Sequence, residues 1–156
     1  MAGEVLVVAE QNEGTPKRAS LEAMTLATSL ASGLGTSAVA VVGGTGAAGA
    51  AEALGRYGAA SVIVVDADNH DPNAWAATVA GQVTDRQPSL VLLANTNHGK
   101  DLGPRIAGLV DAPMASDCVE ITADGGTIVA RRPVFAGKAM VTVSAADGLL
   151  VATLRP

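Results

Sequence analysis

Three glycines in the first third of the chain are spaced as in a phosphate-binding loop. Gly44, Gly46 and Gly49 form a G-x-G-x-x-G motif between an apolar run and a helical pattern, and Asp66 lies 22 positions after Gly44. In dinucleotide-binding folds such glycines let the backbone approach a pyrophosphate, and an acidic residue binds the ribose hydroxyls. The motif predicts either a nucleotide site or, because its other residues are small, a plain turn without a ligand.

A polar segment follows the fourth apolar run of the sequence. In Asn95–Asp101, His98 and Lys100 are cationic or ionisable, and the segment precedes a helical pattern. Ligands of open α/β sheets bind at this edge, where a helix N-terminus favours an anion. The alternative is that Thr96 or Asn97 caps the helix and that Lys100 is merely solvated.

A second cationic group occurs near the end of the chain. Arg131 and Arg132, together with Lys138, could bind a carboxylate or a phosphate. Arginines at such positions are more often the solvated end of a hairpin or part of a contact with a partner protein. Both interpretations are consistent with the sequence.

The remaining reactive side chains do not form a catalytic set. His70 lies in an acidic loop beside Asp68 and Asp71, where a surface position is favoured over a metal site. The single cysteine, Cys118, lies in an apolar segment and is expected to be inert. Because no segment combines a nucleophile, a base and a stabilising group, we expect no enzyme active site and no metal site.

Apolar runs alternate with helical patterns through residue 111, which is typical of βαβ units and a parallel sheet. Thr15 and Pro16 have the residue types of an N-cap and a first helical position, so a helix is predicted from Pro16 to Leu34. Asp71 and Pro72 predict a second helix start. The expected buried strands are VLVVA at 5–9, AVAVV at 38–42, VIVV at 62–65 and LVLLA at 90–94.

After Asp111 the helical patterns stop. Four short strands are predicted, at 119–122, 127–130, 140–143 and 149–154, with hairpin turns at Asp124-Gly125 and Asp147-Gly148. The fold class is therefore α/β: a Rossmann-like parallel sheet with helices on both faces and an antiparallel C-terminal hairpin extension. We expect residues 1–156 to form a single α/β domain.

Composition limits the possible partners. The chain has 156 residues, one cysteine and a net charge of −5, which disfavours a nucleic-acid or anionic membrane surface. Without a long apolar stretch or a signal-peptide pattern, we expect a cytoplasmic protein with no direct membrane insertion. Aromatic residues make up only 2% of the chain, so the core must consist of small aliphatic side chains. Such a core has reason to gain buried area from a partner.

Several ordered motifs resemble the first half of electron transfer flavoprotein alpha subunits. The segment from Thr96 to Arg105 resembles the family pattern T-x-x-G-[RK]-D-L-x-P-R, and the last four residues resemble its T-[VL]-R-P. The similarity covers nearly the whole chain. In chain order, the segments that carry it are VLVVAE at 5–10, KRASLEAMTLA at 17–27, LLANTNHGKDLGPR at 92–105, ASD at 115–117, RPVFAGKA at 132–139 and TLRP at 153–156.

The resemblance implies a specific biology. Such proteins are heterodimers of alpha and beta subunits that carry electrons on FAD, from flavin dehydrogenases to a quinone oxidoreductase or another acceptor. In the alpha subunit the first domain is Rossmann-like, and a second domain holds most of the FAD contacts. That second, FAD-binding domain is absent from this sequence. The resemblance therefore implies FAD in the complete protein, no FAD ligand at any residue here, and no cofactor bound by this domain alone.

The sequence thus favours an electron-carrier subunit rather than an enzyme. Its expected role is a docking and assembly module for the beta subunit and the flavin domain, and an ending at Arg155-Pro156 suggests a complete domain. The alternative is a self-standing nucleotide-binding domain that uses Gly44, Gly46, Gly49 and Asp66.

Overall fold

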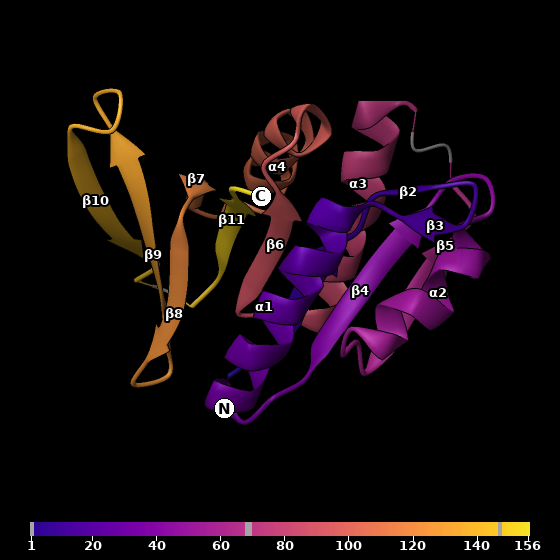
Figure 1. Ribbon diagram of the computed structural model, residues 1–156, viewed down its shortest axis with the longest axis horizontal. Coiled ribbons are helices and arrows are strands. Elements are labelled where there is room, and N and C mark those ends of the chain that lie inside the picture. The colour runs from indigo at the N-terminus through magenta and orange to yellow at the C-terminus, as the bar shows by residue number, and fades with distance from the viewer. Residues whose placement is uncertain (1, 68–69, 147) are drawn as a thin grey trace.

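A six-stranded parallel sheet forms the centre of the protein, as the computed structural model shows for residues 2–67, 70–146 and 148–156 (Figure 1). The strand order is β5-β4-β1-β6-β11-β7. Every neighbouring pair in this sheet is parallel, as the buried apolar runs predicted. The strands are β1 (Val5–Val8), β4 (Ala38–Gly43), β5 (Ser61–Val65), β6 (Leu90–Ala94), β7 (Met114–Cys118) and β11 (Leu150–Leu154).

Helices cover both faces of the sheet, which confirms the predicted α/β class. Along β1 the side chains alternate: Val5 and Val7 pack with α1 and α2, whereas Leu6 and Val8 pack with α3 and α4. The helices are α1 (Arg18–Leu34), α2 (Ala47–Arg56), α3 (Pro72–Arg86) and α4 (Asn97–Leu109). None of the helices in the described part of the chain is long and apolar enough to cross a membrane.

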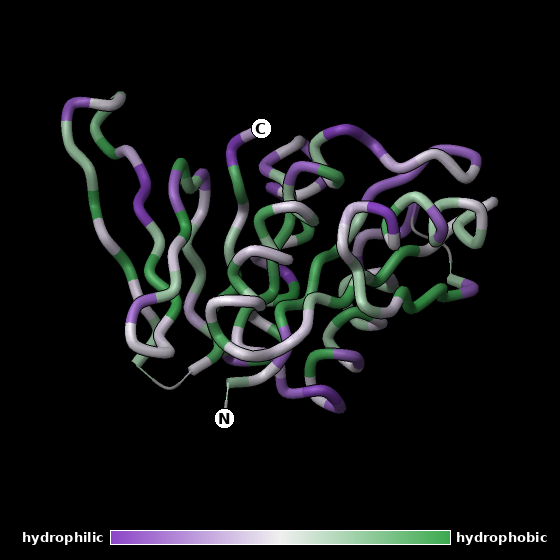
Figure 2. The backbone as a smooth tube through the Cα atoms, turned by 60° about the horizontal axis from the view of Figure 1, so that its bottom comes forward, coloured by the Kyte–Doolittle hydropathy of each residue, from purple (hydrophilic) through white to green (hydrophobic). Residues whose placement is uncertain are grey.

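Three antiparallel strands, in the order β10-β9-β8, stand beside this body and confirm the predicted C-terminal extension. We call residues 120–144, from the start of β8 to the end of β10, the arm. One of its faces adds Ile121, Ile128 and Ala130 to the core on the α1 side of the sheet. Figure 2 shows hydrophobic residues in the central strands and along the arm. The arm strands are β8 (Glu120–Asp124), β9 (Thr127–Val134) and β10 (Ala139–Ser144).

The last strand corrects one prediction. Residues 149–154 were expected to form a hairpin with the preceding strand, but β11 lies in the main sheet, parallel to β6 and β7. Leu150 pairs with Leu90, and Leu150 to Ala152 are fully buried. Burial between two strands stabilises this parallel position, which a local turn signal does not reveal. Of the predicted turn, Asp147 lies outside the described residues.

The start of α1 corrects a second prediction. Thr15 and Pro16 do not begin the helix; they form β3 (Thr15–Pro16), which pairs with β2 (Gln11–Asn12) in a short hairpin. The helix starts at Arg18 with Lys17 as its N-cap, and no side chain caps it. Tertiary contacts of the hairpin, described below, override the local capping signal. At α3 the prediction is confirmed, since Asp71 Oδ1 accepts hydrogen bonds from Asn73 N and Ala74 N.

Candidate functional site

The strand order reverses between β1 and β6: the chain adds β4 and β5 on one side of β1 and then crosses to β6 on the other side. Open α/β sheets usually bind their ligands at such a point. Glu10 follows β1 here and is almost fully buried. Thr96 Oγ1 donates to Glu10 Oε1 at 2.5 Å, and Lys17 Nζ donates to Glu10 Oε2 at 3.0 Å. The backbone N–H of Glu10 donates to Ser20 Oγ at 2.8 Å. This carboxylate therefore joins the ends of two strands to the start of α1.

A cavity of about 440 Å³ opens beside Glu10. His70 and His98, the two histidines of the chain, both line it, together with Lys17 and Trp75. The cavity thus combines the cationic Lys17 and two ionisable histidines with the buried carboxylate of Glu10, which Thr96 and Lys17 already bond. Within the described residues, no three His, Cys, Asp or Glu side chains are grouped so as to hold a metal ion. Asp68, named in the sequence beside His70, lies outside the described residues.

The glycine motif lies one strand away, between β4 and α2. Gly44 and Gly46 have φ angles of 90° and 77°, a backbone conformation that glycine adopts without strain. Gly46 is the N-cap of α2, which begins at Ala47 inside the motif. Gly43 pairs with Val65, so Asp66 follows β5 at the same edge of the sheet. All four residues of the predicted nucleotide site therefore share this edge, and Asp66 is exposed.

The β2–β3 hairpin covers this glycine loop. A Cβ atom at Gly46 would lie 3.0 Å from Gly14 N, and one at Gly49 would lie 3.2 Å from Gly14 Cα. The Gln11 side chain donates to Gly43 O at 3.0 Å and to Thr45 O at 3.1 Å. Backbone therefore packs on backbone where a dinucleotide fold would expose its amides to phosphate.

The second predicted segment forms the start of α4, which begins at Asn97 and shortens the expected loop. Thr96 is the N-cap, and its Oγ1 accepts from Gly99 N at 3.0 Å. Asp101 Oδ1 accepts from Arg105 Nε at 3.1 Å. Lys100 is exposed, and within the described residues it makes no salt bridge.

The two arginines of the third predicted group have separate structural partners. Arg131 pairs with Glu120 across β9 and β8, at 2.9 Å between Nη1 and Oε2. Arg132 Nε donates to the backbone oxygen of Ser116 at 2.7 Å, which ties the arm to β7. Lys138 lies in the turn between β9 and β10 and is not brought together with the arginines.

A network that the sequence did not predict joins the ends of β6, β7 and β11. Asn95 Nδ2 donates to Asp117 Oδ1 at 2.9 Å, and Asp117 N donates to Thr153 Oγ1 at 2.9 Å. The buried hydroxyl of Thr153 donates in turn to Asn95 Oδ1 at 3.0 Å. Arg155 bonds both carboxylate oxygens of Asp117. We call these four residues the Asp117 network; no single motif connects them, because they lie in three segments that are far apart in sequence.

Electrostatics at this edge follow from the same contacts. The hydrogen bond from Arg155 holds the pKa of the Asp117 carboxyl below its usual value, against the opposing effect of burial, with the charge of Lys100 adding to the lowering. The neighbouring Cys118 is buried, and loss of solvation raises the pKa of its thiol to about 11. Burial therefore favours the protonated thiol at neutral pH, in line with the packing role expected from the sequence.

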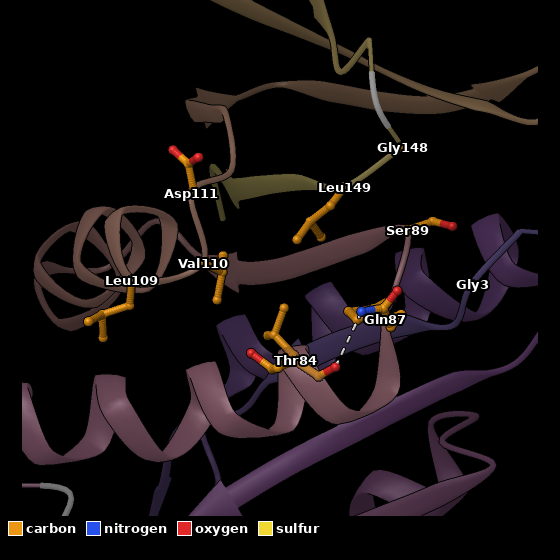
Figure 3. Close-up of a pocket in the computed structure, with 11 residues that line it drawn as sticks. Gly3, Thr84, Gln87, Ser89, Leu109, Val110, Asp111, Gly148 and Leu149 are labelled. Atoms are coloured by element: carbon orange, nitrogen blue, oxygen red, sulfur yellow. Dashed lines mark hydrogen bonds between the residues drawn. The ribbon is translucent and has the colours of Figure 1, made fainter.

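Another cavity, of about 600 Å³, lies at the opposite edge of the sheet (Figure 3). It is bounded by the ends of α3 and α4 and by the residues that precede β1, β6 and β11. Val110 and Leu149 give it an apolar side, and Gln87 and Asp111 lie at its border. This is the amino edge of the strands, away from the positions where the sequence predicted chemistry.

Comparison with known proteins identifies the family. The model of the electron transfer flavoprotein domain matches residues 5–156. The chain belongs to the electron transfer flavoprotein family. Its relatives include the electron transfer flavoprotein subunit alpha of Syntrophomonas wolfei, 31% identical over all of this chain and 49% of that protein. The alpha subunit of Pseudomonas aeruginosa is 30% identical over 97% of this chain and 47% of its own length.

A third relative has a more specific name. The acryloyl-CoA reductase electron transfer subunit beta of Anaerotignum propionicum is 31% identical over 78% of this chain and 34% of its own length. The chain spans about half the length of the curated relatives it matches, and it corresponds to the N-terminal domain of electron transfer flavoprotein alpha subunits. This confirms the family that the sequence motifs resemble.

The structure gives a physical reason for much of the T-x-x-G-[RK]-D-L-x-P-R motif at residues 96–105. Thr96 caps α4 and binds Glu10, while Gly99 has no room for a Cβ atom beside the carbonyl oxygen of Ala94. Asp101 and Arg105 form an ion pair one helical turn apart, and Arg105 also donates to Asn73 Oδ1 on α3. These motif residues hold α4 against β6 and α3.

Proposed function

We propose that this domain docks the beta subunit of an electron transfer flavoprotein through its arm and helps to seat a flavin-binding half. The observation that carries the proposal is the exposure of β10. This six-residue strand, AMVTVS, is uncharged and mainly apolar, yet five of its six residues are exposed. Exposed apolar strands at a sheet edge associate readily with other chains.

The outer end of the arm adds an aromatic side chain to this surface. Phe135 is 80% exposed, and Met140 and Val141 on β10 are 43% and 39% exposed. Phe135 and Ala136 have φ angles of 51° and 54°, followed by Gly137 at 83°. Left-handed backbone at two residues that are not glycine is unfavourable and often occurs where function requires it. We take this turn to present Phe135 to the partner.

The rest of the domain supplies a rigid base for this surface. Arg132 binds Ser116 on β7, and Ile121 and Ile128 fix the inner face of the arm in the core. In the described structure β10 itself pairs only with β9, so its second edge is open. A partner that covers this edge would gain backbone hydrogen bonds as well as apolar area.

The test is sedimentation velocity of the pure chain mixed with its cognate beta subunit, with the flavin half supplied as a separate polypeptide. We expect co-migration, and we expect it to be lost in Val141→Asp and Phe135→Asp. Val64→Asp is the matched control, because Val64 is similarly exposed, at 45%, but lies on β5 at the opposite end of the sheet order. Failure of the unsubstituted proteins to co-migrate, or equal loss in the control, contradicts the proposal.

The cofactor and the electron partners belong to the complete protein in this proposal. FAD is carried there, electrons arrive from dehydrogenases and leave to an acceptor oxidoreductase, and the site of action is the cytoplasm. The chain alone holds no flavin and is therefore a carrier module without an active site of its own. A visible absorbance spectrum of the purified chain tests this, since a yellow colour that dithionite bleaches contradicts it.

The glycine loop has a structural role in the same proposal. Gly46 and Gly49 leave room for the backbone of Gly14, and the Gln11 side chain donates hydrogen bonds to carbonyl oxygens of the loop. Calorimetric titration with NAD, FAD, AMP and ATP separates this role from nucleotide binding. We expect no saturable heat at micromolar concentrations, whereas binding that Gly46→Val abolishes supports the alternative.

A further inference from the structure

The backbone of Asp117 is held in an unfavourable conformation at the edge of the sheet. Its φ angle is +57°, in the left-handed region, and it interrupts the regular pairing of β7 with β11 between Ala152 and Leu154. Aspartate tolerates this conformation better than most residues, but it still costs free energy. Such strain is retained where the surrounding contacts require it, and at Asp117 these contacts are the Asp117 network.

The network fixes the residue that follows β11. Arg155 Nε and Nη2 donate to Asp117 Oδ1 and Oδ2 at 2.9 and 2.5 Å, which is a two-point, charge-assisted contact. The backbone N–H of Arg155 also donates to Cys118 O at 2.8 Å. Arg155 is thus held by both its side chain and its backbone, although it is half-exposed.

The strand ends around Asp117 are themselves fixed. Thr153 is fully buried and bonds both Asn95 and Asp117, while Asn95 N donates to Leu154 O at 2.7 Å. These contacts join β6, β7 and β11 at one point, beside a recess of about 470 Å³ that Lys100 also lines. Asp117 is therefore itself held in place at two points: Asn95 bonds its carboxylate, and Thr153 accepts a hydrogen bond from its backbone N–H.

We infer that Asp117 is a positioning residue that sets the direction in which the polypeptide leaves β11. The consequence rests on the proposed function: in the longer alpha subunits, the half that follows this domain would leave in a defined direction relative to the arm. An arginine with a freely rotating side chain would allow a wide range of directions. The bidentate contact to a strained, fixed aspartate restricts that range.

A distance measurement between two spin labels on this chain tests the inference directly. One label is placed on Ala77→Cys, which is exposed on α3, and the other on a cysteine appended directly after Pro156. The native Cys118 is fully buried and stays unlabelled. Double electron–electron resonance then gives the distribution of distances from the body to the chain end. We expect a single narrow distribution in the otherwise unsubstituted chain.

Two substitutions remove the charge-assisted, two-point contact and are chosen to disturb the fold little. Asp117→Asn retains a residue that tolerates positive φ, and Arg155→Gln retains a polar side chain. In each we expect a distribution at least about twofold broader, because the charge-assisted pair is lost. Glu120→Gln is the matched control, since it breaks the surface pair with Arg131 inside the arm and should leave the width unchanged. Urea unfolding of each variant confirms that it is folded.

An unchanged width in both network variants overturns the inference, and so does equal broadening in the control. Broadening confined to the network variants supports it. The result is separate from that of the docking experiment, because none of the network residues belongs to the arm. Failure of the unsubstituted chain to co-migrate with the beta subunit would contradict the proposed function and leave the distance result standing.

Discussion

Strands β4 and β10 are each six residues long and mainly apolar, yet they differ completely in burial. All six residues of β4 are buried between helices and neighbouring strands, whereas five of the six in β10 are exposed. The residue types specify a strand in both places, but they do not specify what covers it. The body of this domain completes its own burial, whereas β10 stays exposed, and this difference is the basis of our proposal that a partner covers the arm.

The largest expected contrast comes from placing a charge in each strand. Val41 on β4 is fully buried and Val141 on β10 is 39% exposed. Val41→Asp should destabilise the chain by more than about 4 kcal/mol, because an isolated carboxylate would lose its hydration. Val141→Asp should change the free energy of unfolding by less than about 0.5 kcal/mol. Urea titration followed by circular dichroism measures both, and a large loss in Val141→Asp would show that the arm is covered in the free chain.

Aromatic residues provide the second contrast. Trp75 on α3 is 2% exposed, and Phe135 on the arm is 80% exposed. Trp75→Ala should cost about 3–5 kcal/mol through lost burial and the cavity that remains. Phe135→Ala should leave thermal stability almost unchanged in the free chain but weaken association with the beta subunit. The melting temperatures of the two variants check the expected stabilities, and a similar decrease in both would contradict them.

A smaller effect is expected where α4 begins. Thr96→Ala removes both the cap on Gly99 N and the hydrogen bond to Glu10, so it should cost about 1–2 kcal/mol. Thr96→Ser keeps the hydroxyl group and is the control. Chemical unfolding of the two variants measures the difference, and an equal loss in both would assign the effect to the methyl group instead.

The smallest effect is a pH dependence at the Asp117 network. Because Arg155 lowers the pKa of Asp117 in the folded state, this group stabilises the fold above its ordinary value of 3.8 and loses that effect as the pH falls through its folded-state pKa. The stability difference between the unsubstituted chain and Asp117→Asn should therefore shrink as the pH is lowered from 6 towards 3, measured by urea unfolding. A difference that does not change with pH would contradict the role of the charge.

The sequence predicted the parallel sheet because each buried strand is a short continuous apolar run between turn residues. It did not predict the position of β11, because the pairing of Leu150 with Leu90 joins residues far apart in sequence. The signal at Thr15 and Pro16 was interpreted as a helix start for a related reason: the contact of Gly14 with Gly46 and Gly49 outweighs local capping.

For the candidate sites too, the sequence predicted local features but not contacts between distant residues. Spacing alone identified the glycine loop and placed Asp66 at the same edge, but it could not show that a hairpin from the preceding loop lies over the motif. The Asp117 network combines Asn95, Asp117, Thr153 and Arg155, which no local pattern connects. The family motifs contain several of these residues, and only the folded structure shows that they touch.

The contact between Gly14 and the glycine loop indicates how proteins of this fold could gain or lose a nucleotide site in evolution. Since two main-chain segments touch there without intervening side chains, a small anion could enter only if the whole hairpin were displaced or shortened. Deleting the few residues between β1 and α1 would uncover the glycine loop at the start of α2, and a helix N-terminus favours an anion. A short deletion, rather than many substitutions, would then separate a structural member of this fold from one that holds a nucleotide.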